Sequence, residues 1–139
     1  MKNKLTRLAG SLGMTAMLSA MILMAQTATK TGTAEIPFGF EVQGRALPAG
    51  TYTMQELGTS GAVILRNTQS NDSIAVMAPP NKAGKGGEPK LVFTEYGDRY
   101  FLSQIWFQNE EAGHMLLKSR AEKELASKTA GVAAAIRLK

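Results

Sequence analysis

Alternation of apolar and polar positions is the clearest pattern in the chain, and it predicts short β-strands. In the segment EIPFGFEVQG every second residue is apolar, and the apolar members are Ile36, Phe38, Phe40 and Val42. A period of two is typical of a strand that buries one face. Pro37 has no N–H for a ladder, so we expect this strand at a sheet edge or at a bulge.

Turn residues divide the next part of the chain into further strands. Pro48-Ala49-Gly50 favours a tight turn, and TSG and TQSN mark two more. The segments between them are TYTMQEL, AVILRN and DSIAVMA, which have the composition and length of strands. Residues 79–90, PPNKAGKGGEPK, form the longest irregular stretch and are expected to be a mobile loop. Its GKGG lacks the Ser or Thr and the helix that a phosphate-binding loop needs.

A hairpin is predicted in KLVFTEYGDRYFLSQIWF, residues 90–107. Gly97-Asp98 fits a two-residue turn with glycine first, and this register runs from Tyr96 opposite Arg99 to Phe93 opposite Leu102. The second arm is apolar on both faces, with Phe101, Ile105 and Phe107 expected on one and Tyr100, Leu102 and Trp106 on the other. A strand of this kind is usually covered on both sides, which favours a central core hairpin. The alternative is an aromatic binding platform made by Tyr96, Tyr100 and Trp106.

The C-terminal part is expected to contain one helix and a final segment for which the pattern allows several structures. MLLKS, residues 115–119, is expected to be a last short strand or the lead into a helix. Ser119 can cap that helix, and Glu122 three residues later completes a capping box. The final TAGVAAAIRLK can fray, dock as a last strand or extend the helix. The fold class is therefore mainly β: a small antiparallel β-sandwich or barrel of six or seven strands with one short C-terminal helix.

The N-terminus has the layout of a secretory signal peptide. Three basic residues within the first seven positions precede an uncharged run from Leu8 to Ala25. Cleavage is expected after Ala25, with Ala28 as the second choice, and an uncleaved membrane anchor is the alternative. The domain organisation that follows is 1–25 signal peptide, 26–33 flexible lead-in, 34–117 β domain, and 118–139 basic C-terminal helix and tail. The protein is thus expected in the periplasm or outside the cell.

Charge and cysteine content narrow the function classes. The formal net charge of +5 comes from the two ends, because residues 26–117 carry seven basic and nine acidic side chains. Residues 118–139 carry six basic and two acidic side chains, which could attract a polyanion by charge alone. The absence of cysteine excludes disulfides, a lipoprotein anchor and thiol chemistry.

Catalytic and metal chemistry is not indicated by the residue pattern. His114 is the single histidine, and beside a polar turn it is expected to be solvated or to cap. One histidine without cysteine predicts no metal site. Neither Ser103 nor Ser119 lies in a nucleophile elbow, and Glu110-Glu111 are expected to face water. We therefore predict no catalytic residues, no cofactor and no enzymatic activity.

The blocks IPFGFEVQG, LPAGTYTM, KLVFTEYGDRYFLSQIW and LLKSRAEKELA resemble those of small exported proteins of unknown function that are abundant in acidobacterial genomes. The resemblance covers residues 35–126 and implies export and a compact β domain, without a known activity or ligand. The expected function is a non-catalytic structural or binding role in the cell envelope or extracellular space. Partners would be a second copy or an envelope component bound through sheet edges, for which the Pro37 strand and the terminal segment are candidates. The alternative is a carbohydrate- or polyanion-binding module that uses the aromatic hairpin face or the basic tail.

Overall fold

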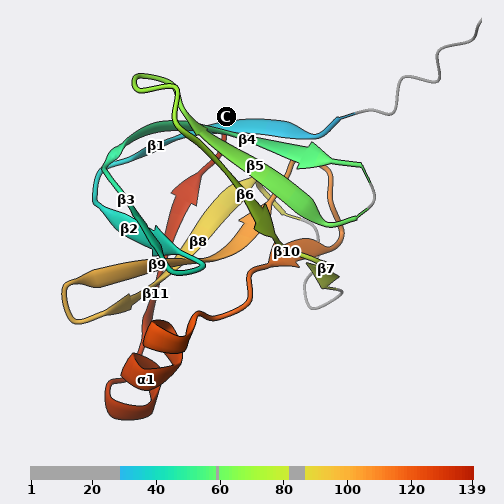
Figure 1. The fold of residues 1–139 in the computed structure, drawn as a ribbon. Coiled ribbons are helices and arrows are strands. Elements are labelled where there is room, and N and C mark those ends of the chain that lie inside the picture. Colours follow the sequence, from blue (N-terminus) through green and yellow to red (C-terminus); the bar gives the residue numbers. More distant parts are fainter. Residues whose placement is uncertain (1–28, 59, 82–86) are drawn as a thin grey trace, which may run out of the picture.

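The computed structural model describes residues 29–58, 60–81 and 87–139 of the 139-residue chain. The predicted signal peptide and its cleavage position at Ala25 lie outside the described residues, as does most of the GKGG segment. The described chain forms two β-sheets and one helix (Figure 1).

The first sheet has four antiparallel strands in the order β1-β4-β5-β6. These are β1 (Thr31–Ile36), β4 (Gly50–Leu57), β5 (Ala62–Asn67) and β6 (Ser73–Met77). The second sheet has the path β11-β8-β9-β10-β7, and β2 joins it through a single parallel bridge to β9. Its strands are β2 (Phe40–Val42), β3 (Arg45–Leu47), β7 (Pro80–Asn81), β8 (Lys90–Tyr96), β9 (Arg99–Trp106), β10 (Gly113–Met115) and β11 (Val132–Arg137).

The two sheets enclose one hydrophobic core, which confirms the predicted small β-sandwich with one short C-terminal helix. Both sheets contribute fully buried side chains; the largest apolar ones are Tyr52, Phe93, Phe107, Ile36, Met54, Leu65, Leu91 and Ile105. The described strands number eleven rather than six or seven, because the first predicted strand is divided into β1 and β2, and short strands such as β3 and β7 form where none was predicted. Burial of apolar surface therefore holds this cysteine-free domain together.

The first predicted strand divides at Pro37 and serves both sheets. Residues up to Ile36 form β1 at the edge of the first sheet, and residues from Phe40 form β2 in the second. Proline cannot continue the ladder, so the chain changes sheet there while its apolar side chains still face the core. We expected residues 26–33 to form a flexible lead-in. This expectation is wrong for residues 31–33, because strand β1 begins at Thr31.

The central hairpin has the predicted turn and register. Gly97 has a φ of 64°, and the pairs run from Tyr96 opposite Arg99 to Phe93 opposite Leu102. Beyond this point the register shifts, since Val92 pairs with Gln104 and Ser103 is the extra residue of a β-bulge. The predicted faces of the second arm are therefore wrong: Leu102 and Ile105 both enter the sandwich core, whereas Phe101 does not belong to that core cluster.

The C-terminal segment forms the helix and docks as a last strand. Helix α1 (Arg120–Lys128) is capped by Ser119, whose hydroxyl accepts a hydrogen bond from the Glu122 N–H at 3.2 Å. The other half of the capping box is not formed: the Glu122 side chain is buried, and its Oε1 has no hydrogen-bond partner among the described residues. Strand β11 pairs with β8 along its length. Just beyond it, Lys139 and Thr33 exchange two backbone hydrogen bonds of 2.8 and 3.0 Å, which join the C-terminal segment to β1 (Figure 1).

Candidate functional site

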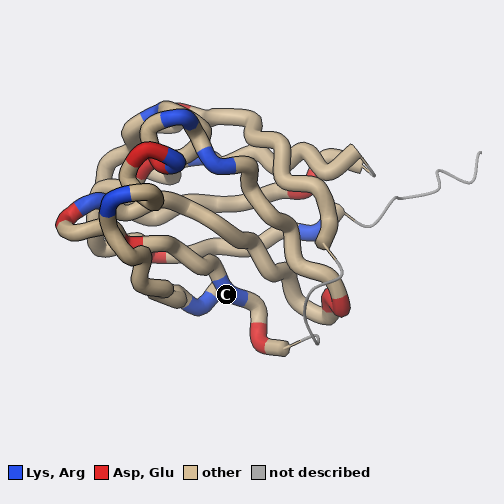
Figure 2. Tube along the Cα trace, turned by 90° about the horizontal axis from the view of Figure 1, so that it is seen from below, with Lys and Arg blue, Asp and Glu red and all other residues tan. Residues whose placement is uncertain are grey.

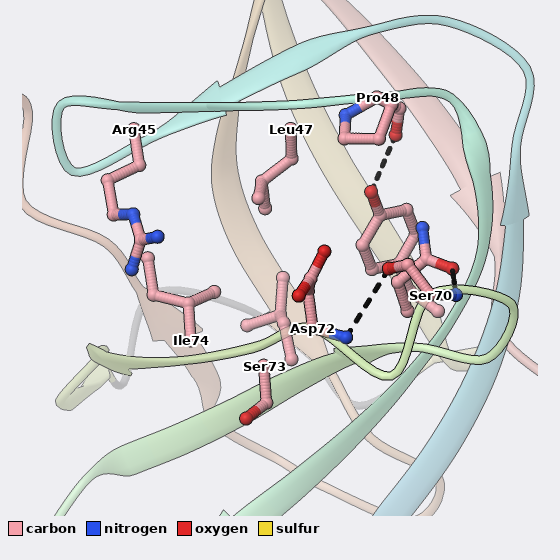
Figure 3. Close-up of a pocket in the computed structure, with 10 residues that line it drawn as sticks. Arg45, Leu47, Pro48, Ser70, Asp72, Ser73 and Ile74 are labelled. Atoms are coloured by element: carbon pink, nitrogen blue, oxygen red, sulfur yellow. Dashed lines mark hydrogen bonds between the residues drawn. The ribbon is translucent and has the colours of Figure 1, made fainter.

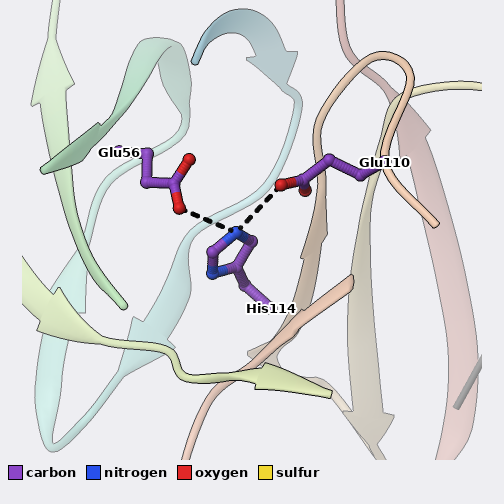
Figure 4. Close-up of side chains that lie close together, drawn as sticks. All are labelled: Glu56, Glu110 and His114. Atoms are coloured by element: carbon purple, nitrogen blue, oxygen red, sulfur yellow. Dashed lines mark hydrogen bonds and ion pairs between the residues drawn. The ribbon is translucent and has the colours of Figure 1, made fainter. Parts of the chain in front are cut away.

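Four ionisable side chains converge in one pocket at an end of the sandwich. They are Lys30, Glu56, Glu110 and His114, and they line a depression of about 420 Å³. The first two come from the β1–β4 sheet, and the other two come from the β9–β10 connection and β10. Figure 4 shows the carboxylates of Glu56 and Glu110 pointing at the same edge of the His114 ring.

Glu56 reaches the pocket because it continues the inward face of β4. Tyr52 and Met54 precede it at alternate positions of that face and are both fully buried. Lys30 lies opposite Glu56, whose N–H donates to the Lys30 carbonyl at 2.9 Å. The two side chains are therefore cross-strand neighbours, and the Lys30 ammonium lies 3.7 Å from a Glu56 oxygen.

His114 is held in one orientation by the backbone. It lies opposite Ile105 in the β9–β10 ladder, so its side chain points inward, and only 1% of its surface is exposed. Its Nδ1 lies 2.7 Å from the carbonyl oxygen of Ala78, which can only accept a hydrogen bond. Nδ1 must therefore carry the proton, and Nε2 faces the carboxylates of Glu110 at 3.4 Å and Glu56 at 3.6 Å.

Glu110 is folded back over the end of the core by a tight turn. Asn109 has a φ of 61°, a left-handed conformation that asparagine tolerates better than most residues. The Phe107 N–H donates to one carboxylate oxygen of Glu110 at 3.3 Å, and the other oxygen contacts both Lys30 and His114. The hydrogen bond and the charge of Glu110 raise the pKa of Lys30, while partial burial acts in the opposite direction.

Two expectations about these residues are wrong. His114 is buried rather than solvated, and Glu110 is buried while only its neighbour Glu111 is exposed. The reason is that a short strand follows the polar turn and pairs with β9, which draws both residues under the end of the sandwich. The alternation Tyr52-Met54-Glu56 is a sequence signal that could have placed Glu56 inward. No sequence spacing could have brought Glu56 and Lys30 beside Glu110 and His114.

The aromatic residues of the predicted platform do not form one surface. Tyr96 is only 5% exposed and packs edge-on against Phe101, with the ring centroids 5.7 Å apart. Tyr100 stacks on Phe38 at 3.8 Å; partial desolvation, followed by a hydrogen bond to Glu95, raises the pKa of its phenol. Trp106 lies near the opposite end of β9 and is half-buried, with its indole N–H donating to Gln104.

Two further cavities lie elsewhere in the sandwich. One of about 40 Å³ lies between β3 and β6 and has room for little more than water (Figure 3). Its walls are fixed by hydrogen bonds such as that from the Tyr52 hydroxyl to the Pro48 carbonyl at 2.6 Å. The other, of about 310 Å³, lies beside the two-bond pair between Arg99 and Glu41, with bonds of 2.9 and 2.8 Å. That pair connects β2 to β9 and is complete without a ligand.

Ser103 and Ser119, the two serines examined for a nucleophile motif in the sequence, have structural roles. Ser103 lies in the bulge, 2.6 Å from the Thr94 hydroxyl, and Ser119 caps α1. Two basic residues of the tail are paired with acidic side chains, Arg120 with Glu124 and Arg137 with Glu88. Figure 2 shows the charged positions interspersed along the trace.

No family model matches this chain, and neither a curated protein nor a solved structure shows significant similarity to it. Within the described ranges, none of the helices has the length and hydrophobicity that crossing a membrane would require.

Proposed function

We propose that this protein is an exported, non-catalytic β-sandwich domain that binds a ligand through the pocket of Lys30, Glu56, Glu110 and His114. Export is supported by the basic start and the uncharged run up to Ala25. The resemblance to small exported acidobacterial proteins agrees with the same location, in the periplasm or outside the cell.

The observation that carries the binding role is the meeting of two carboxylates and a buried histidine in an open pocket. Burying charged groups costs free energy, and hydrophobic replacements of buried ion pairs often stabilise a protein. Pockets that combine apolar walls with a few convergent polar groups are the usual binding sites of small domains. A non-catalytic role is supported by the described residues of the pocket lining, none of which has a hydroxyl side chain, and by the structural use of Ser103 and Ser119.

The experiment is to express the full chain in a bacterial host, locate it by fractionation and measure its mass. We expect periplasmic or extracellular protein cut after Ala25, and Leu18→Arg in the uncharged run should keep the chain in the cytoplasm. Cytoplasmic recovery of the unprocessed wild type contradicts export.

The binding role is tested on the same exported protein by urea unfolding of Glu56→Gln. This variant is isosteric and removes one of two neighbouring carboxylates, so its unfolding free energy should stay within about 0.5 kcal/mol of wild type or rise. A loss of about 3 kcal/mol would show that the cluster is a structural ion network instead. Glu41→Gln, which breaks the pair with Arg99 outside the pocket, is the matched control.

A further inference from the structure

We propose that Glu56, Glu110 and His114 bind a divalent first-row transition-metal ion, for which Zn²⁺ is the test ion. This inference rests on the proposed binding role and names the ligand class of the same pocket. The three side chains each offer one donor atom, and these atoms all lie within 4.8 Å of one another.

The separations between the donors fit such an ion. His114 Nε2 lies 3.4 Å from Glu110 Oε1 and 3.6 Å from Glu56 Oε1. A tetrahedral zinc ion with ligands at about 2.0–2.1 Å would place them about 3.3 Å apart. The third separation, between the two carboxylate donors, is within 4.8 Å, so the carboxylates must turn toward a shared ion to complete a three-ligand site. The open side of the pocket leaves a fourth position for water or a bound molecule.

The surroundings of the donors are those of a prepared site. A metal-binding histidine usually donates its other ring N–H to a carbonyl or carboxylate, which fixes the tautomer. His114 does this with Ala78, so its Nε2 is the atom that faces the two carboxylates. The Phe107 N–H holds the second oxygen of Glu110, and the first oxygen, which contacts Lys30 and His114, is the one that can bind an ion once Lys30 has moved away.

Lys30 occupies the place of a competing cation. Its ammonium contacts Glu110 and lies 3.7 Å from Glu56, and its side chain is 44% exposed. Lys30 directly precedes β1 and its side chain reaches solvent, so it can swing out of the pocket when another cation takes over the charge of the buried Glu110. Lys30 would thus neutralise the pocket in the metal-free protein and leave when the ion binds.

The donor set selects the class of ion. Imidazole is a good ligand for zinc, copper, iron and nickel, whereas calcium prefers six to eight oxygen donors. One histidine and two carboxylates therefore favour Zn²⁺ over Ca²⁺, and Ca²⁺ is the natural control.

The test is a Zn²⁺ titration of the untagged, chelator-treated protein, followed by calorimetry and by NMR of the histidine ring nitrogens. Because His114 is the only histidine in the chain, its ring gives one unambiguous set of signals. We expect binding of one ion, with a large shift of the Nε2 signal while Nδ1 remains protonated. Ca²⁺ at the same concentrations should leave the ring signals unchanged.

Variants separate this site from other places where zinc can bind. Glu110→Gln keeps an acceptor for Phe107 and should weaken binding at least about 100-fold, more than the loss of an outer-shell partner. Lys30→Met should strengthen binding about three- to tenfold, by removal of the competing charge. Glu111→Gln is the matched control, because Glu111 lines the same pocket outside the three-donor cluster and its loss should have little effect.

The proposal is overturned if the His114 signals do not move, or if Zn²⁺ binds equally well to wild type and Glu110→Gln. Either result overturns only the metal proposal. The binding role of the pocket is tested separately, by the unfolding free energy of Glu56→Gln. The two proposals can therefore fail separately.

Discussion

Glu122 is a buried carboxyl group on the first turn of α1, with one oxygen that has no hydrogen-bond partner among the described residues. Burial raises its pKa; Lys118 and the Tyr96 hydroxyl act in the opposite direction, and Glu41 adds a smaller increase. A raised folded-state pKa means that the native protein holds this proton more tightly than the unfolded chain. The stability that protonated Glu122 contributes is therefore complete below its ordinary pKa of 4.5 and is lost as the pH rises through the higher folded value.

Glu122→Gln should consequently stabilise the protein at neutral pH by about 1 kcal/mol, because it removes a charge from a buried position. The difference from wild type should shrink toward zero as the pH falls below 4.5, where the wild-type carboxyl is neutral as well. Urea unfolding at several pH values measures both quantities. Glu124→Gln is the control, since that side chain is exposed on the same helix. A difference that grows toward acid pH would contradict the prediction.

At this scale the sequence predicted local chemistry better than long-range chemistry. The Ser119 cap and the Gly97 turn depend on neighbouring residues and are confirmed. The burial of His114 and Glu110 depends on a strand pairing that begins after an irregular turn, so a local pattern could not reveal it. A lone histidine near two acidic residues gives no spacing signal of a metal site.

The segment after β11 contributes one buried side chain to the core, that of Leu138. Leu138 is 3% exposed and packs so closely on Gly32 that a Cβ at that glycine would lie 2.7 Å from a Leu138 methyl carbon. It therefore fills the space where β11 meets β1.

Leu138→Ala should lower the unfolding free energy by about 2–4 kcal/mol, the usual cost of emptying a buried leucine site. Leu117→Ala is the matched control: Leu117 is 68% exposed, and its loss should change stability by less than about 0.5 kcal/mol. Denaturant midpoints with an unchanged slope provide the measurement. Equal effects of the two substitutions would show that the C-terminal segment does not contribute to the core.

Element boundaries were predictable where turn residues mark them and not where a strand bends. Alternation located the buried face of residues 36–42, yet it could not show that Pro37 divides this segment between two sheets. Alternation also failed past Ser103, because a bulge adds a residue and reverses the two faces. Both departures follow from how strands curve around a closed core.

At the scale of the whole molecule, the expectation of association through sheet edges can now be stated for particular strands. The two candidate edges, β1 and the terminal segment, are bonded to each other through Thr33 and Lys139. Strand β11 still has only β8 beside it in the sheet order of the described chain, and Val132 on it is 62% exposed. We therefore propose β11 as the edge to which a second copy or an envelope component adds.

Size-exclusion chromatography with light scattering tests this proposal for self-association. The apparent mass of wild type should rise with concentration, whereas Ala133→Pro should stay monomeric. The Lys139 N–H donates to Thr33 of β1, on the side away from β8. Backbone N–H groups alternate in direction along a strand, so the Ala133 N–H also points away from β8, to the edge that a partner strand would use. Proline there should spare the pairing with β8, and far-ultraviolet circular dichroism checks that the fold is kept. A constant monomer mass for wild type at millimolar concentration would contradict self-association.

The bonding of Thr33 to Lys139 also constrains the order of events in biosynthesis. The first of the described strands, β1, cannot form its bonds with Lys139 until nearly the entire described chain has emerged from the ribosome. Contacts of such large sequence separation form late and slowly. For the export proposed above, the consequence is that the chain would stay open during passage through a secretion channel and close after it.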